Sequence, residues 1–315
     1  MTESTPIDAL TGSGDCYAGF PDIDQRFHVK LRAYVDLAMP LVFRRLGKTV
    51  PLVDMRRDGL YPIMYFMEFR GAPQPVAFSR PLRIDFEVRL RHYHPPPEGA
   101  PRGTPTSDRF LVDARFTLRG HAGTGRPDDI GPGEGEQDAE PNAHVGTGRV
   151  VQVITRPFAP PGQRQVTRLP DAYRRFTAHP WDEPYPSWEA LTDVPERFSP
   201  PLGADLAPDE STWGVANTDI NQHVNIVEYT SALENRQSRM LAATGLPLAR
   251  HRSVTSRVLF LKPFFAGEPH RIAGTLRRCG PETLFFGGIY KRDQEPGENV
   301  RPGVLMRFEG EIEGE

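Results

Sequence analysis

Apolar and polar residues alternate with a period of two in the second quarter of the chain. Between residues 82 and 91 every second position is apolar and every intervening position is charged. Successive side chains of a strand point to opposite faces, so this segment predicts a strand with one dry face. The pattern recurs over residues 110–118, and β-branched residues predict another strand over 150–155.

Two segments have helical patterns instead. Residues 27–46 are apolar on most of their circumference, which predicts a buried helix, and Pro40 predicts a kink in it because proline removes a backbone hydrogen bond. Residues 225–244 are rich in good helix formers and lack proline and glycine, which predicts a second helix. Strands are expected after it near 253–260, 270–278, 282–291 and 303–312.

Short motifs recur in the two halves of the chain. Residues 22–28 align without a gap against residues 219–225, and a Val-x-Phe-x-basic-Pro pattern occurs at 76–81 and again at 258–263. Both pairs have the same order, with similar predicted elements around them, so we interpret them as an internal duplication. We expect a loosely ordered leader over residues 1–20, a first unit over 21–170, a linker over 171–201 and a second unit over 202–315.

Proline and glycine concentrate in two segments of the first unit, residues 94–108 and 120–148. Their apolar content is too low for independent folding, so we expect exposed loops between strands. The linker carries Trp181, Tyr185 and Trp188, which indicates that it packs against a surface.

Composition narrows the range of functions. The 315 residues suffice for two modest domains, and 38 Lys and Arg against 41 Asp and Glu give a net charge of −3, which does not favour binding to nucleic acid or an anionic membrane. Only Cys16 and Cys279 are present, which argues against a disulfide framework or a cysteine-based zinc site, and no metal ligand is expected. Without a signal sequence or a membrane-length apolar stretch, the expected location is cytoplasmic.

Polar side chains are densest over residues 217–229, where a turn leads into the second predicted helix. The amino end of a helix has unpaired N–H groups and a positive dipole, so it stabilises an oxygen that gains negative charge. His223 is a candidate general base or hydrogen-bond donor to a carbonyl, because its ordinary pKa lies near neutrality; alternatively it braces the helix start. Asp219 is either a functional carboxylate or a helix cap.

Amide side chains complete this candidate site. Asn221 and Asn225 could hold a carbonyl or enolate oxygen without titrating, or could simply form the turn. We take Asn221 as a catalytic candidate with His223. Asn225, Asp219 and Asn217 are the candidate substrate-binding residues.

The pattern Asp-x-Asn-x-His-Val-Asn at residues 219–225, followed by Tyr229, resembles the motif that opens the central helix of hotdog-fold acyl-thioester enzymes, and is most similar to acyl-carrier-protein (ACP) thioesterases. With the duplication, this resemblance implies an α+β double hotdog, in which each of two fused units wraps an antiparallel sheet around a central helix. In the thioesterases a Cys- or acid-containing segment follows the helix, whereas residues 250–256 have neither.

The chain as a whole also resembles the double-hotdog bifunctional methylmalonyl-CoA acyltransferase/decarboxylase of leinamycin-type polyketide biosynthesis. That resemblance implies a tyrosine nucleophile in the first unit, here Tyr61 or, as the second choice, Tyr65; packing between units is the alternative role of Tyr61. It implies transfer of a propionyl group from methylmalonyl-CoA to an acyl carrier protein, with no cofactor.

Three functions therefore stand side by side at this stage. The leading one is the acyltransferase/decarboxylase, the second is an acyl-ACP or acyl-CoA thioesterase, and the third is a non-catalytic acyl-binding scaffold. The sequence leaves the acyl chain, the carrier protein and the choice between monomer and homodimer open.

Overall fold

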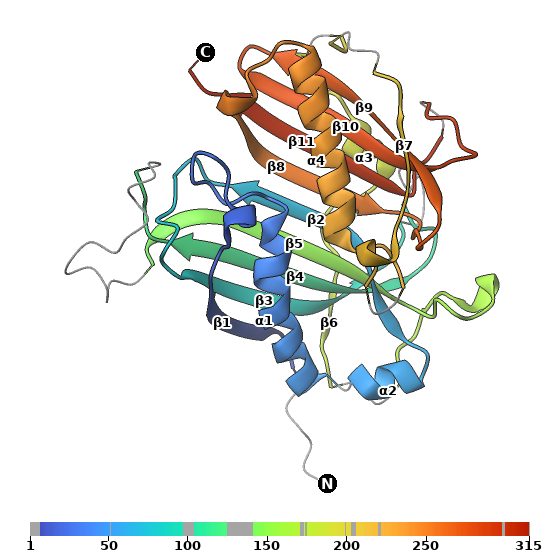
Figure 1. The fold of residues 1–315 in the computed structure, drawn as a ribbon. Helices are drawn as coiled ribbons and strands as arrows, with labels where there is room; N and C mark the ends of the chain where they lie inside the picture. The colour runs from blue at the N-terminus through green and yellow to red at the C-terminus, as the bar shows by residue number, and fades with distance from the viewer. Residues whose placement is uncertain are drawn as a thin grey trace.

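A single antiparallel sheet with two long helices on one face makes up most of the molecule (Figure 1). The computed structural model describes residues 7–50, 52–96, 104–124, 141–170, 173, 175–198, 200–202, 206–219, 222–297 and 300–314. Within these residues the strand order is β1-β3-β4-β5-β2-β8-β11-β10-β9-β7, with every neighbouring pair antiparallel. The short strand β6 is outside this order and pairs in parallel with β3. The order of the second five strands mirrors that of the first five, which is the arrangement expected of a duplicated unit.

The first half contains five strands, whose bounds are β1 Leu10–Cys16, β2 Tyr61–Gly71, β3 Leu82–Tyr93, β4 Arg109–Gly120 and β5 Ala143–Thr155. The alternation predicted for β3 is confirmed, since Leu82, Ile84 and Val88 are buried beneath helix α1 (Ala33–Thr49). A short helix, α2 (Leu52–Arg57), connects α1 to β2.

Helix α1 differs from its prediction at its beginning. Residues 27–32 are not helical: Phe27 has a left-handed φ of 65°, Val29 forms a β-bridge with Ile23, and the helix begins only at Ala33. Pro40 lies inside α1, which continues through it to Thr49. The predicted buried character is confirmed by Tyr34, Ala38 and Val42, none of which is exposed.

Two sequence expectations for loops and ends are wrong. Residues 10–16, assigned to a loosely ordered leader, form β1 and pair with β3 along their whole length. Residues 143–148, assigned to an exposed loop, are the beginning of β5. Both segments are rich in small and polar residues, so their strand character depends on pairing with neighbours rather than on an apolar pattern of their own.

The second half agrees closely with its predicted elements. Helix α4 covers Ile226–Ala243, and the strands are β7 Asp209–Thr212, β8 His251–Phe260, β9 Pro269–Cys279, β10 Glu282–Lys291 and β11 Val304–Ile312. Val304, Met306 and Phe308 share the buried face of β11 and pack with Leu233 of α4.

The two halves join where β2 pairs with β8, from Phe66 opposite Leu259 to Arg70 opposite Thr255. On the helix face, Arg32 at the beginning of α1 donates to the hydroxyl of Ser231 in α4 at 3.1 Å. One apolar core runs through both halves. The halves are therefore continuous in the sheet, between the helices and in the core.

The segment between the halves contains β6 (Ala178–Pro180) and α3 (Trp188–Thr192) and lies over the outer face of the sheet. Tyr185 is buried against Tyr65 and Tyr93, and Trp181 and Trp188 pack at the edge of the same cluster. The predicted packing of these aromatic residues against a surface is confirmed.

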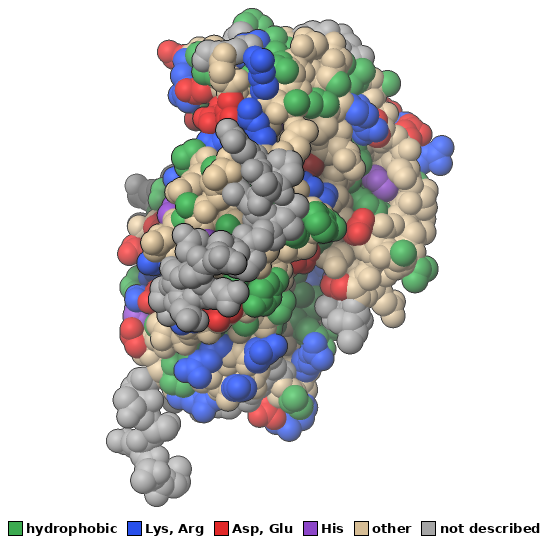
Figure 2. Space-filling model, turned by 60° about the vertical axis from the view of Figure 1, so that its left-hand side comes forward, with side chains coloured by type: hydrophobic (Ala, Val, Ile, Leu, Met, Phe, Trp, Pro, Cys, Tyr) green, Lys and Arg blue, Asp and Glu red, His purple; other side chains and the backbone are tan. Residues whose placement is uncertain are grey.

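Acidic and basic side chains are mixed over the face shown in Figure 2, consistent with the small net charge. No helix among the described residues is both long enough and apolar enough to cross a membrane.

Candidate functional site

The chain folds into the same turn before α1 and before α4. The backbone N–H of Asp24 donates to the carbonyl of His28 at 2.9 Å, and that of Asp219 donates to the carbonyl of His223 at 2.8 Å. Each turn has one left-handed residue, Phe27 or Gln222, immediately before its histidine. His28 and His223 are therefore structurally equivalent.

This equivalence changes the register of the internal repeat. The sequence alignment set His28 against Asn225, whereas the structure moves it by two residues and sets it against His223. In the new register Asp24 matches Asp219 and Tyr34 matches Tyr229, so the pattern Asp-x-x-x-His-Val-x-x-x-x-Tyr is identical in both halves.

The second motif pair is not equivalent in the structure. Residues 76–81 lie between β2 and β3, whereas Val258 and Phe260 lie inside β8. The strand order shows that the two halves have the same topology. The match between residues 76–81 and 258–263, however, does not join equivalent positions.

Two of the predicted substrate-binding residues organise the amino end of α4. The Oδ1 atom of Asn225 accepts from the backbone N–H of Val227 at 3.1 Å, which caps the helix. Asn217 accepts from the N–H of Gly214 at 2.9 Å and donates to the carboxylate of Glu228 at 2.9 Å. Both amides stabilise the turn. For Asn225 this is the structural alternative that the sequence left open.

His223 is half-buried beside this helix end. Its backbone bridges to Phe265, and the two rings meet edge to face with centroids 5.0 Å apart. The next residue, Val224, is buried and donates its N–H to the carbonyl of Phe264 at 2.9 Å. Asp219 is exposed, and Asn221 lies outside the described residues.

Tyr229 fixes the same region from within the helix. Its hydroxyl accepts the backbone N–H of Phe264 at 2.9 Å, and burial raises its pKa well above the ordinary value. The phenol is therefore neutral and structural. It anchors α4 to the segment that carries Phe265, the ring neighbour of His223.

The equivalent histidine of the first half has a different environment. His28 is only 8% exposed, and its ring contacts Asp24 Oδ2 at 3.3 Å and the carbonyl of Pro73 at 3.1 Å. Burial opposes the charge of Asp24, but hydrogen bonds from the His28 ring and from the N–H groups of His28 and Arg26 outweigh it and lower the pKa of Asp24. Because both ring nitrogens of His28 are engaged, this copy of the motif has a structural role.

The two candidate tyrosines also differ. Tyr61 is half-buried at the beginning of β2, and its ring meets Phe158 edge to face at 5.4 Å. Tyr65 donates its hydroxyl to the carbonyl of Pro186 at 2.7 Å, and burial raises its pKa to about 12. No hydrogen bond or ring contact joins Tyr61 to His223 in the part of the chain that the structure describes.

An apolar cavity of about 80 Å³ lies in the first half. Its walls come from the end of α1, from α2 and from the strands beneath them; among the lining residues are Leu46, Met55, Val112, Ile154 and Phe176. The lining is almost wholly apolar, but the cavity is well below the roughly 300–1,000 Å³ of typical ligand pockets, so as it stands it suits only a short alkyl group.

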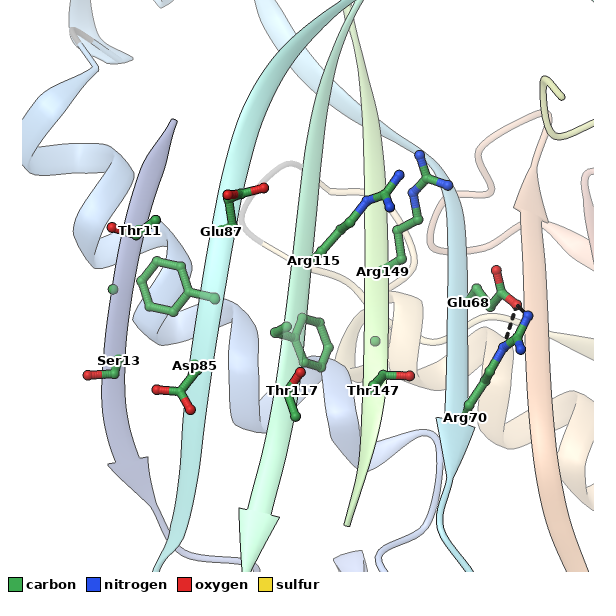
Figure 3. A pocket seen from close by; sticks show the side chains of 14 residues that line it. Thr11, Ser13, Glu68, Arg70, Asp85, Glu87, Arg115, Thr117, Thr147 and Arg149 are labelled. Carbon is green, nitrogen blue, oxygen red and sulfur yellow. Dashed lines mark hydrogen bonds and ion pairs between the residues drawn. The ribbon is translucent and has the colours of Figure 1, made fainter. Parts of the chain in front are cut away.

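A larger hollow, about 830 Å³, lies on the opposite face of the same strands and is open to solvent (Figure 3). Its charged side chains pair with one another or with nearby groups, as Arg70 does with Glu68 at 2.7 Å. It is far wider than the apolar cavity, but its side chains lie on the solvent face of the strands, so we assign no reaction to it.

Three solved structures similar to this one over almost the whole chain are described as thioesterases. An acyl-ACP thioesterase from Bacteroides thetaiotaomicron has a TM-score of 0.55 and 11% identity, with 96% of this chain and 98% of that chain covered. The 12:0-ACP thioesterase from Umbellularia californica has a TM-score of 0.62 and 11% identity, with 96% of this chain and 95% of that chain covered. A protein described as an oleoyl thioesterase, from Lactobacillus plantarum, has a TM-score of 0.59 and 14% identity, with 98% of each chain covered.

The fold is a double hotdog. This confirms the fold predicted from the sequence, because the similarity extends over almost the whole of each chain. No protein-family model matches the chain, and no curated protein sequence matches it.

The sequence interpretation missed two features of the site. The complete Asp/His/Tyr repeat was hidden by the two-residue error in register, although the identical spacing was readable in the chain. The apolar cavity could not be found from the sequence, because its walls come from segments far apart in the chain.

Proposed function

We propose that the chain is a thioesterase that hydrolyses an acyl group carried by an acyl carrier protein or coenzyme A. The observation that carries the proposal is the position of His223, half-buried at the amino end of α4 in the second half of a double hotdog. The full-length similarity to thioesterase structures supports this function over the acyltransferase/decarboxylase.

The chemistry assigned to this site is attack of water on the thioester carbonyl. His223 removes a proton from the water as the oxygen bonds to the carbonyl carbon, and returns it to the sulfur when the carbon–sulfur bond breaks. The carbonyl oxygen gains negative charge in between. The positive end of α4, with the amide of Asn221 as a candidate donor, stabilises that charge.

The apolar cavity of the first half is the proposed position of the acyl chain. In this arrangement the first half of the protein binds the acyl chain and the second half supplies the reacting groups. The motif copy that contains His28 then needs only a structural role. Asp219 and Asn217 then act through the turn that presents His223, with Asn217 held by Glu228.

Methylmalonyl-CoA acyltransferase/decarboxylase activity is the second proposal, and one observation favours keeping Tyr61 as its nucleophile. Tyr61 is half-buried, whereas the hydroxyl of Tyr65 is bonded to the carbonyl of Pro186. In that reaction the phenol oxygen would bond to the acyl carbon, and its proton would go to the sulfur of the departing CoA thiol. Loss of the free carboxylate as carbon dioxide, with a solvent proton added to the resulting enolate carbon, would leave a propionyl ester, and attack by the carrier thiol would regenerate the phenol.

A single experiment separates the two activities. The protein is incubated with acyl-ACP and acyl-CoA of several chain lengths and with methylmalonyl-CoA, and free acid, free thiol, carbon dioxide and protein-bound acyl groups are measured. We expect free acid and thiol, with loss of both in a His223→Ala variant. If instead carbon dioxide is released and a propionyl adduct forms on the wild type but not on Tyr61→Phe, the activity is acyl transfer with decarboxylation and not hydrolysis.

A further inference from the structure

Two histidines lie at the end of β3, outside the site described above. His92 and His94 are separated by one residue, so the extended chain directs both rings to the same face. Tyr93 between them points the other way and is buried against Tyr185 with ring centroids 4.5 Å apart. The pattern His-x-His on an extended segment thus presents two imidazoles side by side.

Pairing of β3 with β4 brings a carboxylate to the same place. Tyr93 is opposite Arg109, so the antiparallel register sets Asp108 opposite His94. The carbonyl of Asp108 accepts from the side-chain amide of Gln165 at 3.0 Å, which holds this backbone in position. His92 stacks on Phe110, with ring planes 10° apart and centroids at 4.2 Å.

The three side chains have the separations of metal ligands. The Nε2 atom of His92 lies 3.4 Å from Asp108 Oδ2, and the Nδ1 atom of His94 lies 3.2 Å from the same oxygen. All three ligand atoms lie within 4.8 Å of one another. Zinc bonds of about 2.0–2.1 Å in a tetrahedron put neighbouring ligand atoms about 3.3–3.5 Å apart, so little movement is needed to close around an ion.

One ligand atom makes no hydrogen bond to any residue that the structure describes. His92 Nε2 is buried, its ring is fixed by Phe110, and Asp108 Oδ2 lies 3.4 Å away without hydrogen-bond geometry. A buried polar nitrogen without a partner is costly, and an ion at this position would satisfy it.

We propose that His92, His94 and Asp108 form a binding site for a divalent transition-metal ion, with Zn²⁺ as the ion of best fit. Two imidazole nitrogens and one carboxylate oxygen suit zinc, copper and nickel better than magnesium or calcium, which prefer oxygen ligands. The side chains of His94 and Asp108 are 60% and 37% exposed, so solvent completes the coordination.

The bound ion would cross-link the end of β3 to Asp108, the residue before β4. The proposal is independent of the thioesterase site, and its test needs no measurement of activity.

Zinc binding is measured by isothermal titration on the full chain without an affinity tag, after treatment with a chelator. We expect one site per chain with micromolar affinity, a higher melting temperature with Zn²⁺, and affinity reduced at least about tenfold in His94→Asn and in Asp108→Asn. His179→Asn is the matched control. His179 also pairs with a carboxylate, that of Asp8 at 2.9 Å, but among the described residues no second histidine lies within reach of a shared ion.

Coordination is checked independently by X-ray absorption at the zinc edge, where two imidazoles and one carboxylate oxygen are expected. The proposal is overturned if wild type binds no zinc in this range, or if His94→Asn and Asp108→Asn bind as wild type does. In either case the cluster is an ion pair of histidine with Asp108. Circular dichroism of each variant establishes that it is folded.

Discussion

His28 and His223 occupy equivalent turns, and both ring nitrogens of His28 are engaged, by Asp24 and the carbonyl of Pro73, whereas the His223 ring makes no hydrogen bond to a described residue. His223 lies half-buried against Phe265 at the start of the other helix. The same turn thus holds its histidine in two different environments, one in which the ring stabilises the turn and one in which it is half-exposed. Substitution of His223 should lower activity with little effect on stability, whereas substitution of His28 should lower stability with little effect on activity.

The His223→Ala variant should lose thioester hydrolysis by at least about a hundredfold in kcat, because the proposed proton transfer is removed. Its thermal stability should change little, since the ring is half-exposed. Hydrolysis is followed by release of free thiol, and unfolding by circular dichroism. Hydrolysis at the wild-type rate would remove His223 from the mechanism.

The His28→Ala variant should retain the hydrolytic rate while it remains folded, but lose about 1–3 kcal/mol of unfolding free energy. Its removal takes the ring partner from Asp24 Oδ2 and empties a position that is only 8% exposed, while Asp24 Oδ1 keeps the backbone N–H groups of Arg26 and His28. Urea denaturation measures the change. An unchanged midpoint would show that the pair contributes nothing to stability.

Filling the apolar cavity should shorten the preferred acyl chain. A Val112→Phe substitution places a ring in the cavity wall, and we expect kcat/KM for the longest substrates to fall about tenfold while short substrates are little affected. Val53→Phe is the control, because Val53 is on neighbouring α2 but is 80% exposed. An equal loss for all chain lengths would place the acyl group elsewhere.

Asp113 is expected to be the most sensitive charge on the outer face of the sheet. It is 2% exposed and accepts from Arg149 at 2.7 and 2.9 Å and from Arg115 at 3.3 Å. Asp113→Asn should cost about 1–3 kcal/mol of unfolding free energy, because it removes the buried negative charge that Arg149 and Arg115 share, although both arginines still pair with Glu183. Asp182→Asn, at a side chain 74% exposed, should cost little.

Stability should depend on pH through Glu234, between α4 and α1. Burial raises its pKa to about 7, although Arg32 lies 3.7 Å away and acts in the opposite direction. The folded state therefore keeps this proton at pH values where the unfolded state has lost it, so stability falls as the pH rises from about 4.5 to about 7.

A Glu234→Gln variant removes this penalty. Relative to wild type it should be more stable by about 1–2 kcal/mol at pH 8 and by much less at pH 5. Paired denaturation curves at the two pH values give the difference. Glu196→Gln, at an exposed carboxylate, serves as the control, and the same gain at both pH values would contradict the assignment.

The regular elements of the second half were predictable because each is specified by its own residues. The composition of residues 225–244 predicted α4 to within one residue at each end, and the apolar positions of residues 304–308 predicted β11 and its buried face. Segments without such a pattern were not predictable. β1 and the beginning of β5 are strands because a neighbouring strand pairs with them. The boundaries 21–170 and 202–315 stay a prediction.

The sequence by itself determined the helix and strands of the second half and the polar segment around His223, because strand period, helix composition and turn residues act over short distances along the chain. The double hotdog was implied by the resemblance of residues 219–229 to the hotdog-fold motif. The tertiary structure decided which histidine is buried, where the apolar cavity lies and that Asp108 meets His92 and His94. These depend on strand pairing and burial between residues distant in sequence, whose energies no local pattern contains.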